Sequence, residues 1–559
     1  MKKLLYILAL IFCSVPALAQ NKDWGRVSAS LESLNHFYVD DAANNFLPTE
    51  DYKFEYLNGR RYATNNYLKV DYYKGRLSAG LQLEGYFPTT IGYPLPESML
   101  SLSNLYVAWT DNDYSVTAGT FYEQLGSGLL FRSWEDRALG LNNAILGARA
   151  TYNYKDIFNV RVFGGIPRVG KITLGAYNNS GGYFKVFSLG LTQTALAAAD
   201  VGFSLSECLG WNRTILAVEG SVLYKHEELN EFRIQEGLRT NNFGYSARIN
   251  FDIDGFYAKG EYVGAGKQYS LDYGVQDGNA QLIELGYNNR GLGISFTGRR
   301  LYCMQQRVML GTSTLPSEIN IMSYAPALCS QHTYMLANLN PYTPYVDGEI
   351  GGQIDAFYNF RRGTKIGGKR GLKVHANLAS YFSLGNNGAI KGSKESLLDF
   401  CFDVEKQWTK KFKMTLLYSL QDHNREQMGL VVLDGENMVR DIYIGMSHTV
   451  VADLLYKWTK SFSTRLELQY LTTKDYQKDW MAALLEVSFA PSWSIFASDM
   501  YNHGSTKMHY YNAGVSYSYK WIRVAAGYGR YRAGFICSGG VCRQIPAYTG
   551  ANLTLTASF

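Results

Sequence analysis

Two charged residues of each sign lie within six positions in one short stretch of the chain. They are Arg132, Glu135, Asp136 and Arg137. Charged side chains that surround a narrow passage select solutes by sign, so this group could line a constriction. A charge run between strands is commonly a solvated surface loop, and that interpretation stays open.

Four further residues extend this candidate constriction. Glu123 begins the same polar stretch, Arg299 and Arg300 lie just before the long polar and aromatic connection 305–347, and His332 lies within it. We predict that these side chains and the charged group together line the lumen of a hollow fold. The alternative is that inward polar residues only solvate the lumen.

The eight histidines show no spacing that is typical of catalysis. They are dispersed over many segments, and no serine occupies a Gly-x-Ser-x-Gly nucleophile elbow. A zinc site would need about four tetrahedral ligands, and no second close Cys/His pair accompanies Cys537 and Cys542. We therefore predict no catalytic residue, no cofactor and no bound metal, and we expect that the chain is not an enzyme.

The sequence Cys537-Ser-Gly-Gly-Val-Cys542 places a Gly-Gly turn between two cysteines and lies between two strand patterns. We predict a loop-closing disulfide here, which an exported protein can form. The pairing of the other cysteines beyond residue 19 does not follow from sequence alone. These cysteines are Cys208, Cys303, Cys329 and Cys401.

Short strands must position all of these groups. Leu68, Val70 and Tyr72 alternate with polar residues, and the same alternation recurs in 398–420 and 511–528. A soluble sandwich could explain one such hairpin, but a chain of this length would then need linkers between domains, and no composition shift divides it. The repetition predicts one transmembrane antiparallel β-barrel.

Short turns alternate with long connections along the chain, as in outer-membrane barrels with periplasmic turns and extracellular loops. We count about 24 strands, or roughly 22 to 26 given boundary errors of a few residues. An even number places both termini at the periplasmic rim. Four tryptophans fall at short turns and suit a periplasmic aromatic girdle. They are Trp408, Trp458, Trp493 and Trp521.

The two ends of the chain carry export and assembly signals. Residues 1–19 combine two lysines, an apolar run and a small-residue cleavage motif, which predicts a cleaved signal peptide. Residues 20–559 would then form a single barrel, whose wall begins near Arg26 and leaves no room for a separate plug domain. The alternating strand that ends at Phe559 predicts recognition by the outer-membrane insertion machinery. We expect an integral protein of the outer membrane, in contact with its lipid.

Five basic residues crowd the sequence RRGTKIGGKR: Arg361, Arg362, Lys365, Lys369 and Arg370. Strand parity places this turn at the periplasmic rim, where ten residues is long. A basic periplasmic loop could contact lipid phosphates or an acidic partner protein, and a plain solvated turn is the alternative. Nucleic acid is not expected as a partner, because no nucleic-acid-binding fold accompanies the charges.

Three segments carry a resemblance to a known family. They are FYEQLGSGLLFRSWEDRALGLNN at 121–143, ALCSQHTYMLANLNPY at 327–342 and GGVCRQIPAYTGANLTLTASF at 539–559. The chain resembles a domain-of-unknown-function family of large Bacteroidota outer-membrane β-barrels over its whole mature length. The resemblance implies a fold and a location. It implies no substrate and no functional residue, because the family has none assigned.

Two functions fit these expectations. The first is a porin-like or substrate-specific channel for passive passage of solutes, with the connections 123–145 and 305–347 constricting the lumen. A barrel of this size would be a large leak if its lumen were unfilled. The second is a non-transporting accessory or scaffold barrel in a Bacteroidota outer-membrane assembly, secretion or surface-export complex, with the subunits of that complex as partners.

Overall fold

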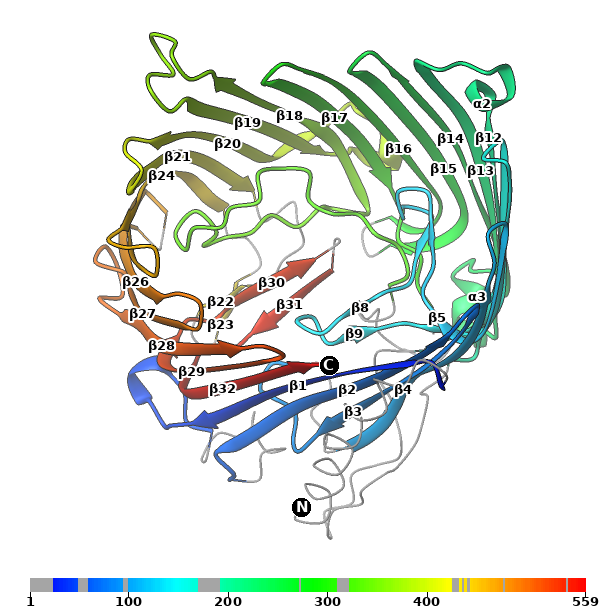
Figure 1. Cartoon of the computed structure of the whole chain (residues 1–559). Coiled ribbons are helices and arrows are strands. Elements are labelled where there is room, and N and C mark those ends of the chain that lie inside the picture. Colours follow the sequence, from blue (N-terminus) through cyan, green and yellow to red (C-terminus); the bar gives the residue numbers. More distant parts are fainter. Residues whose placement is uncertain are drawn as a thin grey trace.

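Twenty-four strands form one closed antiparallel β-barrel (Figure 1). Strand β1 (Arg26–Tyr38) pairs with β2 (Tyr62–Lys74) on one side and with β32 (Tyr548–Ser558) on the other, which closes the sheet on itself. Closure satisfies the backbone groups at the sheet edges, as a barrel in lipid requires. The predicted fold and the predicted number of strands are both confirmed.

The computed structural model describes residues 24–48, 59–93, 99–168, 192–270, 273–308, 321–424, 432–434, 437–439, 443–475, 478–538 and 541–559. The predicted signal peptide, residues 1–19, lies outside these ranges.

The remaining wall strands follow one another around the barrel. They are β3 (Leu77–Tyr86), β4 (Met99–Thr110), β5 (Tyr114–Phe121), β10 (Ile145–Tyr154), β11 (Phe158–Pro167), β12 (Thr194–Ser204), β13 (Thr214–Glu227), β14 (Asn241–Ile253), β15 (Phe256–Ser270), β16 (Gly274–Asn289), β17 (Leu292–Tyr302), β18 (Gly348–Phe360), β19 (Leu372–Ser383), β20 (Lys394–Gln407), β21 (Phe412–Asn424), β24 (Tyr443–Lys457), β25 (Phe462–Thr473), β26 (Trp480–Phe489), β27 (Trp493–Tyr501), β28 (His509–Tyr519) and β29 (Ile522–Tyr531).

Among the residues that the structure describes, the connections contain four small two-stranded sheets and four short helices. The sheets are β6 (Gln124–Leu125) with β7 (Phe131–Arg132), β8 (Glu135–Asp136) with β9 (Leu141–Asn142), β22 (Val432–Asp434) with β23 (Asn437–Val439), and β30 (Gly534–Ser538) with β31 (Val541–Ile545). The helices are α2 (Leu205–Leu209), α3 (Glu231–Gln235) and the 3₁₀ turns η2 (Ala42–Asn44) and η5 (Asn386–Gly388). Within the described ranges, no helix is long and apolar enough to cross a membrane.

Alternate residues of the wall strands face outward and inward, and β14 shows the chemical difference between the two faces. On β14, Phe243 and Tyr245 are exposed on the outside of the barrel, whereas Ser246 and Arg248 are buried in its interior. Successive side chains of a strand point to opposite faces, so the alternation in the sequence becomes two chemically different surfaces. An exposed apolar outer face is the property that fits a barrel wall to lipid.

The four tryptophans of the predicted girdle are all exposed and lie at or beside short turns. Trp408 and Trp458 follow β20 and β24, and Trp493 and Trp521 lie at the starts of β27 and β29. All four turns are at the same end of the barrel, because each joins a strand that runs down to one that runs up. Their position matches the headgroup depth at which tryptophan is enriched.

The polar stretch between β5 and β10 interrupts the wall where the sequence predicted. The sequence predicts a connection over 123–145, and the wall strands end at Phe121 and resume at Ile145. The two small sheets between them were not expected. Strands of two residues carry no alternation that a sequence pattern can detect.

Candidate functional site

Three connections fold inward and pack together inside the ring of wall strands (Figure 1). We call them the lumenal assembly, which comprises residues 122–144, the described residues of 303–347 and the β30–β31 hairpin. Hydrogen bonds join the first two segments, from the Arg132 amide to the Met322 carbonyl and from the Tyr324 amide to the Gly128 carbonyl, each 2.8 Å long. The lumen is therefore occupied in part by the chain itself.

Apolar packing holds the three segments together. Trp134 and Leu141 from the first segment form one buried cluster with Ile321 from the second and Val541 from the hairpin. A larger cluster packs the first two segments against the inner wall of β11 to β17. Its buried members include Leu125, Leu130, Phe131, Met322, Phe163, Leu223, Val263 and Leu301. The assembly thus has a hydrophobic core that it shares with one side of the barrel.

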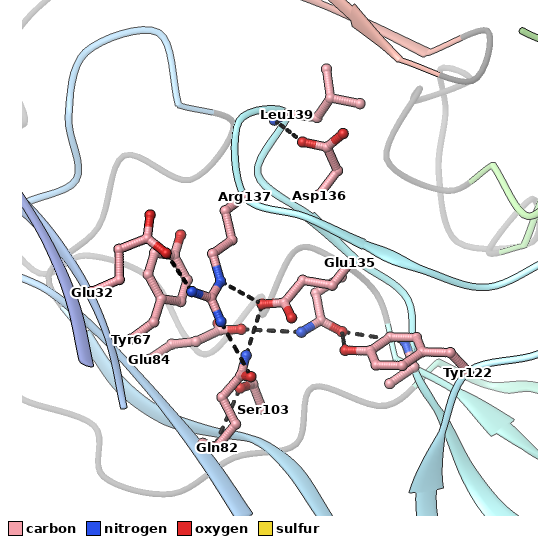
Figure 2. A network of polar contacts seen from close by, with 12 residues as sticks. Glu32, Tyr67, Gln82, Glu84, Ser103, Tyr122, Glu135, Asp136, Arg137 and Leu139 are labelled. Atoms are coloured by element: carbon pink, nitrogen blue, oxygen red, sulfur yellow. Dashed lines mark hydrogen bonds and ion pairs between the residues drawn. The ribbon is translucent and has the colours of Figure 1, made fainter. Parts of the chain in front are cut away.

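Arg137 is the centre of a polar network that ties the assembly to β1 and β3 (Figure 2). Its guanidinium donates to Glu32 at 2.5 Å and to Glu135 at 3.1 Å, and its carbon lies 4.4 Å from the ring centre of Tyr67. Gln82 donates to the same Glu135 carboxylate at 2.7 Å. Burial alone would lower the pKa of Arg137, but Glu135 and Glu32 outweigh burial and raise that pKa.

Asp136, the next residue after Glu135, serves the hairpin itself. Its carboxylate accepts a hydrogen bond from the backbone amide of Leu139 at 3.1 Å, which closes the turn between β8 and β9 (Figure 2). Carboxylates commonly stabilise turns in this way. Asp136 therefore supports the position of Arg137 by shaping the hairpin that carries it.

Glu123 anchors the beginning of the same segment. It is buried, and its two carboxylate oxygens lie 2.7 Å from Arg149 of β10 and 3.1 Å from Arg161 of β11. A few residues later, the Ser127 amide donates to Glu261 of β15 at 3.1 Å. Residues 122–144 therefore span from the β1–β3 wall to β15, with ion pairs to β1, β10 and β11 and a hydrogen bond to β15.

Arg132 pairs with aromatic rings of the assembly. Its guanidinium carbon lies 3.8 Å from the ring centre of Tyr324 and 5.4 Å from that of Trp134. Cation–π contacts of this length are favourable when the cation is desolvated. The charge of Arg132 is thus directed into the junction between the first two segments.

Arg299 and Arg300 lie on opposite faces of β17. Arg299 points inward, where it contacts Glu349 at 3.1 Å and the Pro326 carbonyl at 2.5 Å. Arg300 instead contacts Asn279 at 2.5 Å and the Gly388 carbonyl at 2.9 Å. Because adjacent side chains of a strand alternate, the two arginines cannot both line the lumen, and the prediction for Arg300 is corrected.

His332 lies on the far side of the assembly from Arg137. Its Nε2 is 2.7 Å from Asp399 of β20, and Gln421 of β21 donates to the same carboxylate at 3.1 Å. The predicted constriction residues therefore contact different walls and do not converge on one ring. Glu135 and Arg137 are brought together, and the charges that face inward are largely paired.

Sequence patterns missed a second deeply buried ion pair in the region of the assembly. Arg168, just after β11, makes two hydrogen bonds to Glu84 of β3, at 3.1 and 3.0 Å, and both side chains are buried. The two residues are far apart in sequence. The sequence shows Glu84 only as a polar residue in an alternating strand pattern. No local sequence pattern identifies Arg168 as its partner.

The basic residues of the β18–β19 connection lie at the same rim as the tryptophan girdle. Arg361, Arg362, Lys365 and Lys369 are exposed, and Arg370 is partly exposed. The Lys406 ammonium group donates to the Gly367 carbonyl at 2.7 Å, which holds the turn against β20. A cavity of about 440 Å³ beside the turn is lined by several of these arginines. The partner of this surface stays a prediction.

Among the described residues, Cys208, Cys329 and Cys401 are free thiols, whereas the buried Cys303 thiol lies 3.8 Å from the Asp347 carbonyl oxygen. Burial raises the pKa of the Cys329 thiol. The strand register pairs Cys537 with Cys542 across the β30–β31 hairpin, and their side chains lie outside the described residues. No group of three or more His, Cys, Asp or Glu side chains among the described residues is arranged to hold a metal ion.

The register of this hairpin makes the predicted disulfide directly testable. Alkylation of the purified protein without reductant should leave Cys537 and Cys542 unmodified, while the exposed Cys208 reacts. Mass spectrometry of the peptide that spans the hairpin should show a mass lower by two hydrogens than after reduction. Cys542→Ser should make Cys537 reactive. Full alkylation of both cysteines in the unreduced native protein would contradict the disulfide.

The sequence profile of a family described as "Family of unknown function (DUF6029)" matches residues 1–559. None of the curated proteins matches the chain.

Solved structures are similar in architecture at very low sequence identity. The siderophore receptor PirA from Pseudomonas aeruginosa is 8% identical, with a TM-score of 0.41, over 96% of this chain and 80% of that one. The translocation pore of the P pilus usher PapC is 7% identical, with a TM-score of 0.42, over 95% and 99%. The copper transporter OprC is 11% identical, with a TM-score of 0.40, over 96% and 81%.

Proposed function

We propose that the chain, which belongs to the family of unknown function DUF6029, is an outer-membrane channel for passive passage of small polar solutes. The lumenal assembly narrows its passage. The exposed apolar outer face and the tryptophan girdle support an outer-membrane location, and residues 1–19 would direct export as a cleaved signal peptide. The insertion machinery would recognise the C-terminal strand.

One observation carries the channel proposal. The inner wall of β18 to β25 keeps charged side chains in partial contact with solvent, among them Asp355, His375, Asp403 and Arg465. Charged groups would be costly in a dry interior, so their exposure supports a hydrated passage beside the assembly. A scaffold whose barrel was completely filled would not require charged, hydrated side chains on its inner wall.

The charges on this wall favour cations. His375 lies between two carboxylates, at 2.8 Å from Asp355 and 2.6 Å from Asp403. Arg465 lies at 2.9 Å from Asp453 and 2.6 Å from Glu467. Two carboxylates around each base leave each cluster with no excess of positive charge even when the histidine is protonated. A low-dielectric passage lined in this way attracts cations and repels anions.

Conductance in planar bilayers tests this function. The purified barrel should give stable steps whose reversal potential in a KCl gradient indicates cation preference. The double substitution Asp355→Asn with Asp403→Asn should weaken that preference. Asp277→Asn is a matched control, because Asp277 is exposed and forms an ion pair with Lys267 at 3.1 Å, away from both clusters. A folded wild-type barrel that conducts nothing would exclude the channel.

The basic turn favours the second candidate function, an accessory barrel of a larger outer-membrane complex. Its exposed arginines and lysines form a surface suited to an acidic partner at the periplasmic rim. Replacing Arg361, Arg362 and Lys365 with glutamate would then remove a copurifying partner without changing conductance. Copurification that survives this substitution would count against docking at the turn.

A further inference from the structure

A cavity of about 380 Å³ lies between the second segment of the lumenal assembly and the wall of β20 and β21. It is lined by Tyr324, Pro326, Ala327, Cys329, Ser330 and Gln331 on one part of its surface. Gln331 and Asn338, which also line it, are exposed, so the cavity communicates with solvent. Its size is within the range of small-molecule sites in proteins.

Two polar side chains in this cavity are buried and incompletely satisfied. His332 and Asp399 face one another at 2.7 Å, with side chains only 5% and 2% exposed. The Nδ1 atom of His332 and the Oδ1 atom of Asp399 have no hydrogen-bond partner among the described residues. Buried polar atoms are nearly always hydrogen-bonded in folded proteins. Both residues line this solvent-connected cavity, which points to a bound polar molecule as the missing partner.

The chemistry of these atoms restricts the ligand. The Asp399 Oδ1 atom of an ionised carboxylate can only accept, so the ligand must offer a donor. The role of His332 Nδ1 depends on which ring nitrogen carries the proton, and a hydroxyl group can serve either form. Lysine and arginine are absent from the described lining, which disfavours phosphate or carboxylate ligands.

The remaining walls suit the carbon skeleton of such a ligand. Tyr342 and Tyr324 line the cavity together with Pro341 and Pro344. Aromatic and proline rings pack against C–H groups, while a few convergent polar atoms set orientation. Gln421 donates to Asp399 Oδ2 at 3.1 Å and so fixes the carboxylate that the ligand would contact.

We propose that this cavity binds a small neutral polyhydroxylated molecule of about monosaccharide size. Its hydroxyl groups form hydrogen bonds with Asp399 Oδ1 and His332 Nδ1, and its C–H faces pack on the tyrosine and proline rings. The inference rests on the proposed function in one respect, because it names the class of solute that the channel would select. Binding itself does not require that the barrel conducts.

D-Glucose is the probe for this site, with the full-length barrel purified in detergent. Saturation-transfer NMR and calorimetric titration should detect binding to the wild type. Asp399→Asn and His332→Gln should each weaken it by about tenfold or more, since each removes a hydrogen bond to a buried group. Heat-modifiable gel mobility verifies that each variant is folded.

A second variant keeps the test decisive if the polar pair proves necessary for folding. Asn338→Trp would fill the cavity from its exposed lining and should abolish glucose binding while His332 and Asp399 stay in place. Thr333→Trp is the matched control, because Thr333 is exposed and is not part of the cavity lining. Glucose binding that persists in Asn338→Trp would place the ligand elsewhere and overturn the proposal.

Other outcomes separate this site from the proposed channel. Conductance without glucose binding would overturn the cavity proposal and leave the channel standing. Glucose binding without conductance would support the cavity and exclude the channel. Binding of choline in place of glucose would identify a cation site and overturn the neutral ligand.

Discussion

Replacing Arg299 with methionine is expected to destabilise the barrel by about 3–5 kcal/mol, because it leaves a buried carboxylate without its partner. The side chains of Arg299 and Glu349 are 1% and 0% exposed, and their nearest atoms are 3.1 Å apart. Arg299 also donates to the Pro326 carbonyl of the lumenal assembly. The substitution should therefore loosen the assembly as well as the wall.

The Glu349 carboxylate also binds the lumenal assembly, so its loss of a partner should affect the assembly. It accepts hydrogen bonds from the Tyr342 hydroxyl and, at 2.9 Å, from the Tyr345 amide, so it holds the end of the second segment against β18. Removing both charges, in Arg299→Met with Glu349→Gln, should recover part of the lost stability. A buried pair replaced as a whole costs much less than one that loses a single partner.

Unfolding in urea, followed by tryptophan fluorescence in detergent, measures the effect. Arg300→Met is the matched control, since Arg300 is the next residue on the same strand and lies on the opposite face. We expect at most about 1 kcal/mol for this partly exposed residue. Equal losses for the two single substitutions would contradict the role given to the Arg299–Glu349 pair.

Phe131→Ala is expected to release the lumenal assembly from the wall and so to increase the single-channel conductance. Phe131 is almost completely buried, and its ring centre lies 5.6 Å from that of Phe163 on β11. Truncating a buried phenylalanine to alanine costs about 3–5 kcal/mol, through lost burial and the cavity that remains. The loss of stability should affect the packing of the assembly, while the hydrogen-bonded wall stays folded.

Two measurements check this prediction together. Conductance steps should become larger or more variable, and the first segment should become accessible to protease while the barrel keeps its heat-modifiable mobility. Phe232→Ala in α3 is the matched control, because Phe232 is exposed and lies in the connection between β13 and β14. Unchanged conductance in a variant with a demonstrably loosened assembly would mean that the assembly does not limit the passage.

The barrel itself could be predicted because its signal is local. Phe243, Tyr245 and Ser246 on β14 show the reason: lipid and lumen impose different chemistry on alternate residues of every strand. Repetition of that period predicted the closed wall and the number of strands. The ends of β5 and β10 were predicted to within a residue for the same reason.

The arrangement of the candidate site residues could not be predicted from the sequence. Arg137 pairs with Glu32, and Arg132 stacks on Tyr324, across separations in sequence that no local pattern encodes. Arg300 was grouped with Arg299 because the two are neighbours, although strand geometry sends adjacent side chains to opposite faces. A stricter use of alternation would have separated them.

Sequence alone determined that this chain is a large antiparallel barrel with polar connections long enough to enter its lumen, since alternation and loop length are properties of neighbouring residues. Only the tertiary structure decided what those connections contact. Trp134, Ile321 and Val541 come from three distant segments and form one buried cluster. Such contacts depend on which surfaces fit after the wall has closed, and closure is a property of the whole chain.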